Sequence, residues 1–148
     1  MLDSLLRRYA DLFTIFANGA IVDGPVLAVI SSERAIGTMR RARVRFAEVD
    51  GRIANLRDAL PASRALMPLV SDSWDRITKW KGDGPMPAVA RRELERVVGL
   101  AHKHGQRIRF WGTPDNAAVW QVLLDARVDL IGADDLDGLR TILLTRRR

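Results

Sequence analysis

The two side chains best suited to chemistry are Arg109 and Trp111, which lie two positions apart in a stretch that alternates polar and apolar residues. Such alternation predicts a β-strand, with Ile108 and Phe110 on one face and Arg109 and Trp111 on the other. A guanidinium group binds phosphate or carboxylate through paired hydrogen bonds, and an indole ring offers a flat wall for a ligand. The pair therefore predicts a site for an anionic substrate.

The sequence leaves structural roles open for the same two residues. Arg109 could form an ion pair with Glu48 or Asp134 inside a barrel, and Trp111 could fill core volume as strand tryptophans usually do. These roles do not exclude substrate binding. The choice depends on what surrounds the two side chains.

Polar residues also occur where other expected strands end. In parallel βα folds the functional face lies beyond the carboxyl ends of the strands. The predicted substrate-binding residues are Arg109, Trp111, Ser31, Glu48, Asp50, Ser71 and Asp134.

No catalytic residue and no metal ligand is assigned from the sequence. His102 and His104 lie at the end of an expected helix without an acidic companion at ligand spacing, so we expect both at the surface. Asp134 and Asp135 could bind a cation, but Asp135 can equally cap the helix that follows it, and capping is our expectation.

The elements that must position these residues alternate between strands and helices. Apolar spacing predicts an amphipathic helix over residues 2–16 that ends at Asn18-Gly19. The expected strands are 26–31, 44–46 with a turn at Asp50-Gly51, 66–71, 107–111 and 128–134. The expected helices are 33–42, 87–105, 114–126 and 135–144, with a loop at 80–85. Repeated βα units predict an α/β fold with a parallel sheet, either open and doubly wound or closed as a barrel.

Length and composition set further bounds. The chain has 148 residues, enough for a single globular domain, and no apolar run long enough to span a bilayer. It has no cysteine, which excludes disulfides, thiolate catalysis and cysteine-bound zinc. The formal net charge is +6, but the arginines are spread along the chain. A solvated surface therefore explains the charge better than nucleic-acid binding does.

Residues 104–111 resemble the seventh strand of glycerophosphodiester phosphodiesterase-like barrels, and residues 128–134 resemble the eighth. The subgroup that contains the altered inheritance of mitochondria proteins and phosphoinositide phospholipase C-like bacterial proteins is the more similar one. The motifs that carry this likeness are Arg109-Phe110-Trp111, Thr113-Pro114-Asp115, Val119-Trp120 and Asp134-Asp135-Leu136. Ala133 departs from the pattern, since the family generally has threonine there.

The resemblance implies a partial (β/α) TIM barrel over residues 1–148, with about five parallel units that correspond to the family's strands four to eight. It also implies phosphoric diester hydrolysis in lipid metabolism, with a phosphodiester or phospholipid head group as ligand and a calcium or magnesium ion as cofactor. The family places its catalytic histidines and acidic metal ligands on strands one to three. We therefore expect the C-terminal part of such a phosphodiesterase, inactive alone.

A complete (β/α) barrel typically needs about 250 residues, so five units would form an open wedge with unpaired outer strands. We expect self-association, association with a separate amino-terminal half, or marginal stability. A truncated gene or a start assigned too late would produce such a sequence. The sequence as written begins without an export leader and predicts a cytoplasmic protein, whereas a leader upstream would imply export.

Two other functions stay open. One is a non-enzymatic module that binds phospholipid head groups or another protein. The other is a small doubly wound domain that resembles a receiver domain, with Asp50 as an acid at its rim.

Overall fold

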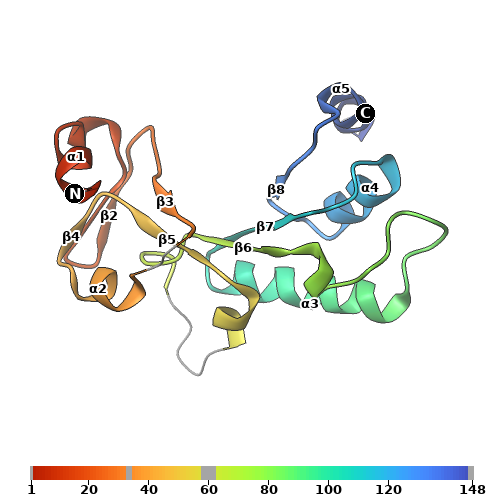
Figure 1. Cartoon of the computed structure of the whole chain (residues 1–148), viewed down its shortest axis with the longest axis horizontal. Helices are drawn as coiled ribbons and strands as arrows, with labels where there is room; N and C mark the ends of the chain where they lie inside the picture. The colour runs from red at the N-terminus through yellow and green to blue at the C-terminus, as the bar shows by residue number, and fades with distance from the viewer. Residues whose placement is uncertain (1, 33–34, 58–62, 147–148) are drawn as a thin grey trace. The chain divides into compact units, whose positions relative to one another are not determined.

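A computed structural model describes residues 2–32, 35–57 and 63–146. The chain divides into two compact units, residues 1–70 with 104–106 and residues 71–103 with 107–148. Figure 1 labels most of the helices and strands of both units. No helix in the described part of the chain combines the length and apolarity that crossing a membrane requires.

The first unit joins a small antiparallel sheet to the beginning of a parallel one. Strands β2, β1 and β4 form the antiparallel sheet in that order. The core beside β5 consists of Val49, Leu66 and Met67, against which Ile36 and Met39 pack. The elements of this unit are α1 (Leu2–Arg7), a 3-10 helix η1 (Ala10–Leu12), β1 (Ile15–Ala17), β2 (Ala20–Val22), β3 (Val29–Ile30), α2 (Ile36–Arg41), β4 (Val44–Arg45), β5 (Glu48–Gly51) and a 3-10 helix η2 (Ile53–Arg57).

The expected helix over 2–16 is wrong beyond its first turns. Residues 15–17 form β1, and Asn18 and Gly19 both have positive φ, 52° and 83°, in the turn to β2. An Asn-Gly pair with this geometry is the preferred turn of a two-residue hairpin. Pairing of Ala17 with Ala20 and burial of Phe16 in β1 therefore override the helical spacing of the apolar residues.

The strand expected at 44–46 with a turn at Asp50-Gly51 is also different in the structure. Residues 44 and 45 form β4, which pairs with β1 in the antiparallel sheet. Asp50 and Gly51 are not in a turn, because they lie in β5 and pair with Leu69 and Val70 of β6. Two short strands of different sheets thus replace one expected strand.

The parallel sheet contains five strands, the number expected, although β5 takes the place of the strand expected at 44–46. Its order is β3-β5-β6-β7-β8, with β6 at Leu69–Ser73, β7 at Arg107–Trp111 and β8 at Leu130–Ile131. The expected α/β fold with parallel βα units is confirmed. The strands also follow each other in chain order, whereas a receiver-like domain has the order 2-1-3-4-5. The receiver-like alternative is therefore wrong.

Strand β6 begins three residues later than expected and continues to Ser73. Pro68 comes directly before it and has no N–H to donate to a sheet. Leu66 and Met67 instead donate their N–H groups to the carbonyl of Ser63 and enter the core of the first unit.

The second unit follows the sequence expectations closely. The helical residues Ala90, Leu94, Val97, Val98 and Ala101 are all buried on one face of α3. This helix packs along β7 (Figure 1). Its further elements are a 3-10 helix η3 (Trp74–Arg76), α3 (Ala88–Lys103), α4 (Ala117–Asp125) and α5 (Leu136–Arg146).

Particular residues at the ends of these helices explain why the helix boundaries can be predicted from the sequence. Gly105, with φ of 69°, lies just after α3, where a left-handed residue commonly ends a helix. The Asn116 side chain accepts the N–H of Val119 and caps α4, so that helix begins at Ala117 and not at Pro114. Asp135 accepts the N–H of Gly138, as expected for a residue that caps α5.

Candidate functional site

A cleft of about 400 Å³ opens in the second unit at the carboxyl ends of β7 and β8. Three of the predicted site residues line it together, namely Arg109, Trp111 and Asp134. Thr113 and Asp115, from the loop after β7, complete its polar lining. The cleft is therefore where the sequence placed the functional rim.

Strand β7 explains how Arg109 and Trp111 reach the same cleft. Ile108 and Phe110 are buried, while Arg109 and Trp111 alternate with them and are exposed. The Phe110 ring meets the buried Trp74 ring edge-on, with 5.9 Å between centroids. Trp111 has 52% of its surface exposed, so it is not a core residue.

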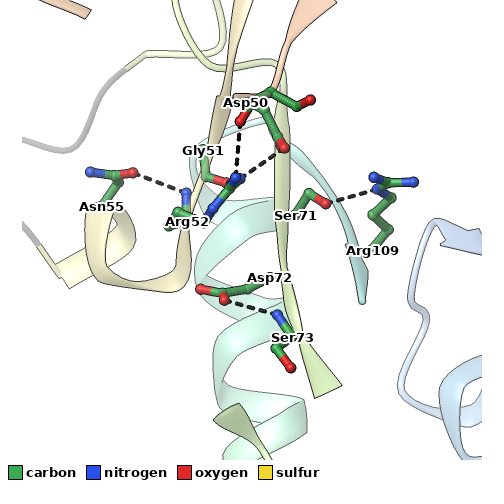
Figure 2. Close-up of polar contacts among 9 residues, drawn as sticks. Asp50, Gly51, Arg52, Asn55, Ser71, Asp72, Ser73 and Arg109 are labelled. Carbon is green, nitrogen blue, oxygen red and sulfur yellow. Dashed lines mark hydrogen bonds and ion pairs between the residues drawn. The ribbon is translucent and has the colours of Figure 1, made fainter. Parts of the chain in front are cut away.

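A serine from the neighbouring strand holds the Arg109 side chain. The Nε–H of Arg109 donates to Ser71 Oγ at 2.8 Å, as Figure 2 shows. Ser71 is almost fully buried in the middle of β6, not at its end. The two terminal nitrogens of Arg109 have no partner among the described residues. They are thus available for a bidentate contact with an anion.

Asp115 shapes the cleft through its backbone partners. Its Oδ2 accepts the N–H of Asp134 at 3.0 Å and that of Asp135 at 2.8 Å. This ties the loop after β7 to the start of α5 and spends part of the acceptor capacity of Asp115 inside the protein. In the sequence, Asp115 stands out only as part of a motif shared with the family, because its partners are about twenty residues away in the chain.

Asp72 and Ser73 end β6 without entering the lining of this cleft. Asp72 Oδ1 accepts the N–H of Ser73 at 2.8 Å (Figure 2), and Ser73 Oγ accepts the N–H of Asp75. Both contacts organise the turn from β6 into η3.

In the first unit, Arg52 connects two other predicted site residues. It pairs with the buried Asp50 carboxylate at 2.8 Å (Figure 2) and donates to the backbone carbonyl of Ser31 at 3.1 Å. Ser31 therefore contributes its carbonyl to this contact. Arg52 was not predicted, although its position two residues after Asp50 allows the pair in an extended chain.

Glu48 was expected at the carboxyl end of a strand, and this expected position is wrong. It is the first residue of β5, fully buried, and its Oε1 accepts from Arg45 Nε at 3.0 Å. The proposed ion pair of Arg109 with Glu48 is therefore replaced by a pair with Arg45. Burial raises the pKa of the Glu48 carboxyl from 4.5 to about 7, against the hydrogen bond and charge of Arg45, which lower it.

The histidines lie near the other end of β7. His102 is exposed, as expected, and its Nε2 lies 3.0 Å from Asp129 Oδ2. The same oxygen accepts the N–H of Ile108 at the start of β7. His104 is only partly exposed, and its Nδ1 is buried without a partner in the described part of the chain.

The acids do not fit the divalent cation that the resemblance implies. Within residues 2–32, 35–57 and 63–146, no three side chains of histidine, cysteine, aspartate or glutamate gather as a metal ion requires. Asp50 is engaged by Arg52, and Asp115 is engaged by backbone N–H groups.

Comparison of the chain with protein-family models, with curated proteins and with solved structures found no match. The likeness of residues 104–111 and 128–134 to phosphodiesterase barrels stays a prediction from their motifs.

Proposed function

We propose that this chain binds a phosphodiester head group in the cleft of Arg109 and Trp111, as the head-group-recognising part of a phosphodiesterase-like barrel. The observation that carries the proposal is the placement of Arg109. Ser71 holds its Nε, and the terminal nitrogens stay unpaired among the described residues beside an exposed indole. Two parallel N–H donors match the oxygens of a phosphate.

The rest of the cleft suits the remainder of a head group. Trp111 offers a ring face that can stack on a glycerol backbone or attract a quaternary ammonium group. Asp134, on the same lining, can accept hydrogen bonds from hydroxyl groups or balance a cationic head. A zwitterionic or glycerol-bearing phosphodiester satisfies the arginine and the acid together.

The topology supports the barrel as the parent architecture. Parallel strands in chain order, with the cleft at their carboxyl ends, are what successive units of a (β/α) barrel provide. We propose that the five strands correspond to the last five of such a barrel and that residues 1–148 belong to one barrel domain.

We propose that this chain alone binds the diester without hydrolysing it. In-line hydrolysis needs proton transfer within hydrogen-bond reach of the reacting oxygens. His102 contacts Asp129 beside the amino end of β7, whereas Arg109 and Trp111 lie toward the carboxyl end of the same strand. The proton-transfer groups of the complete reaction would have to come from another part of the barrel.

Calorimetric titration with sn-glycero-3-phosphocholine tests the proposal. We expect saturable binding that Arg109→Ala weakens at least tenfold, since a hydrogen bond to a charged group contributes about 1.5–3 kcal/mol. Arg140→Ala is the matched control, because Arg140 is an exposed arginine on α5 outside the cleft lining. Equal binding by the Arg109→Ala variant would contradict the site.

Hydrolysis is tested separately with the same diester and calcium or magnesium. We expect no release of choline or glycerol phosphate above a protein-free blank. Robust turnover that Arg109→Ala abolishes would keep the binding site but overturn its non-catalytic role.

A second candidate function, association with another polypeptide, is favoured by the edge of the parallel sheet. Strand β8 pairs on one side with β7, and Leu130 on it is exposed. Helix α5 has no fully buried residue in its described span and exposes Leu136, Leu143 and Leu144. A further strand-and-helix unit would cover both surfaces, as the next unit of a barrel does.

A further inference from the structure

The first unit contains a second cleft, of about 440 Å³, that is separate from the site of Arg109. Its lining comes from the turn between β1 and β2, from the end of α2, and from Ser63, Ala65 and Leu66. Its polar side chains are those of Asn18, Arg40, Arg43, Arg45 and Ser63. Among the residues that the structure describes, no carboxylate side chain lines this cleft.

Arg45 serves as a structural support in this cleft. Its guanidinium donates to Glu48, to the carbonyls of Met39 and Ala42 at the end of α2, and to the carbonyl of Ala65. The group also lies 5.7 Å from the centre of the Phe16 ring. All of its nitrogens are thus engaged, and Arg45 joins the three segments that form the walls.

Arg40 and Arg43 are in a different position. Both are exposed, and neither side chain has a hydrogen bond or ion pair with any residue that the structure describes. The backbone of Arg43 is fixed, because its carbonyl accepts the N–H of Asn18 at 2.9 Å and the next residue, Val44, pairs with Ala17. Two unpaired guanidinium groups therefore line one cleft from a defined backbone.

The neutral donors of the cleft also favour an anion. The Asn18 amide and the Ser63 hydroxyl have no side-chain hydrogen bond in the described structure. Cationic and neutral donors, with no opposing acid among the described lining residues, favour an anion with several oxygens, and the planar arginine fork matches phosphate in particular. Small apolar residues such as Ala20 and Ala65 leave room for an organic group attached to it.

We propose that this cleft is an anion site for a phosphomonoester, held by Arg40 and Arg43 and assisted by Asn18 and Ser63. The site does not depend on the head-group cleft, since it uses other residues and another unit of the chain. It gives the protein a second phosphate-recognising position.

The test is an NMR titration of the full chain with inorganic phosphate and then glycerol 3-phosphate. We expect saturable shifts of the Asn18 and Gly19 amides, with about a tenfold or larger loss of affinity in Arg43→Ala and a further loss in the Arg40→Ala/Arg43→Ala double variant. Arg92→Ala, which changes an exposed arginine of α3, and Arg109→Ala should leave these shifts in place. Sodium chloride at equal ionic strength should not reproduce them.

Vesicles distinguish the source of the phosphate group. Sedimentation with phosphatidic acid vesicles but not with phosphatidylcholine vesicles would assign a lipid phosphomonoester, and binding of free glycerol 3-phosphate alone would assign a soluble one. Both outcomes support the site. Absence of saturable shifts at Asn18 and Gly19, or wild-type affinity in the double variant, would overturn it. Arg43→Lys, which keeps the charge, and thermal unfolding of each variant separate lost binding from lost folding.

Discussion

Arg109 has one nitrogen that donates to Ser71 and two nitrogens without a partner among the described residues. We propose that this division suits the side chain to recognising an anion. A lysine has a single point charge and could not hold Ser71 and a phosphate in the same fixed geometry. The buried hydroxyl of Ser71 therefore sets the direction in which the Arg109 guanidinium points, while the charge of the guanidinium does not depend on it.

Replacement of Ser71 tests this positioning role. We expect Ser71→Ala to weaken binding of sn-glycero-3-phosphocholine several-fold, less than Arg109→Ala, because the charge stays but its orientation is lost. Ser71→Thr keeps the hydroxyl and should recover most of the affinity. The affinity of each variant is measured by calorimetric titration below its unfolding temperature. Wild-type affinity in Ser71→Ala would show that Arg109 needs no anchor.

Glu48 gives the folded protein a pH dependence in the neutral range. Its pKa is about 7 in the folded chain against an ordinary 4.5, because burial disfavours the carboxylate. The folded state thus holds this proton more tightly than the unfolded state. Its contribution to the free energy of unfolding is fully present below about pH 4.5 and is lost as the pH rises through about 7. A shift of this size corresponds to on the order of 3 kcal/mol.

Glu48→Gln removes the titrating group while keeping an oxygen that can accept from Arg45. We expect the free energy of unfolding of the variant to vary less between pH 5 and 8 than that of the wild type. Urea unfolding at a series of pH values measures the difference. Parallel pH profiles of variant and wild type would contradict the raised pKa.

The residues that line the cleft could be predicted from the sequence only where a local pattern determines their position. Arg109 and Trp111 follow from the period of two in β7, and Asp134 follows from its place after β8. Ser71 was predicted, but not as the partner of Arg109, because the two are 38 positions apart. The Glu48 prediction failed because the strand begins at this residue, so its carboxyl end lies elsewhere.

At the scale of elements, prediction succeeded for long, periodic segments. Helix α3 has enough turns for its apolar face to be unambiguous, and β7 alternates along its whole length. The helix predicted over residues 2–16 is wrong beyond its first turns, because apolar residues at helical spacing also fit a short strand once Asn18 and Gly19 form a hairpin. The pairing of segments in the folded chain decides such cases, and the local pattern of residues does not show which segments will pair.

Two glycines give opposite expectations for alanine substitution. A Cβ at Gly24 would overlap the backbone of Phe13 and Thr14, whose positions are fixed by pairing around residue 26. We expect Gly24→Ala to lower the free energy of unfolding by about 1–3 kcal/mol. Gly99 lies in α3 with open space around it, so Gly99→Ala should raise that free energy by about 0.5–1 kcal/mol. Thermal and urea unfolding measure both, and the same sign for the two variants would contradict this description of the fold.

At the scale of the molecule, the parallel sheet ends in strands that pair on one side only. Among the described residues, β3 pairs within this sheet with β5, and β8 pairs with β7. Exposed strand edges form hydrogen bonds with other chains unless they are covered. The sequence predicted the number and direction of these strands, but a barrel also requires closure, which five strands do not show.

Association is the consequence that can be measured. We expect the purified chain to associate reversibly with increasing concentration, because Leu130 on β8 and Leu143 and Leu144 on α5 are exposed. A Leu143→Lys/Leu144→Lys variant should shift the mass toward the monomer, whereas Val89→Lys, at an exposed position on α3, should not. Size-exclusion chromatography with light scattering reports the mass. A wild-type chain that stays monomeric at all concentrations would contradict an interface at this edge.

The central claim is that the cleft at the end of β7 recognises a phosphodiester. The most direct measurement is an NMR titration of the chain with sn-glycero-3-phosphocholine, observing backbone amides and the tryptophan indole groups. We expect saturable shifts at Trp111, Gly112 and Asp134 that disappear in Arg109→Ala and persist in Arg140→Ala. Shifts that avoid these residues, or that survive the loss of Arg109, would contradict it.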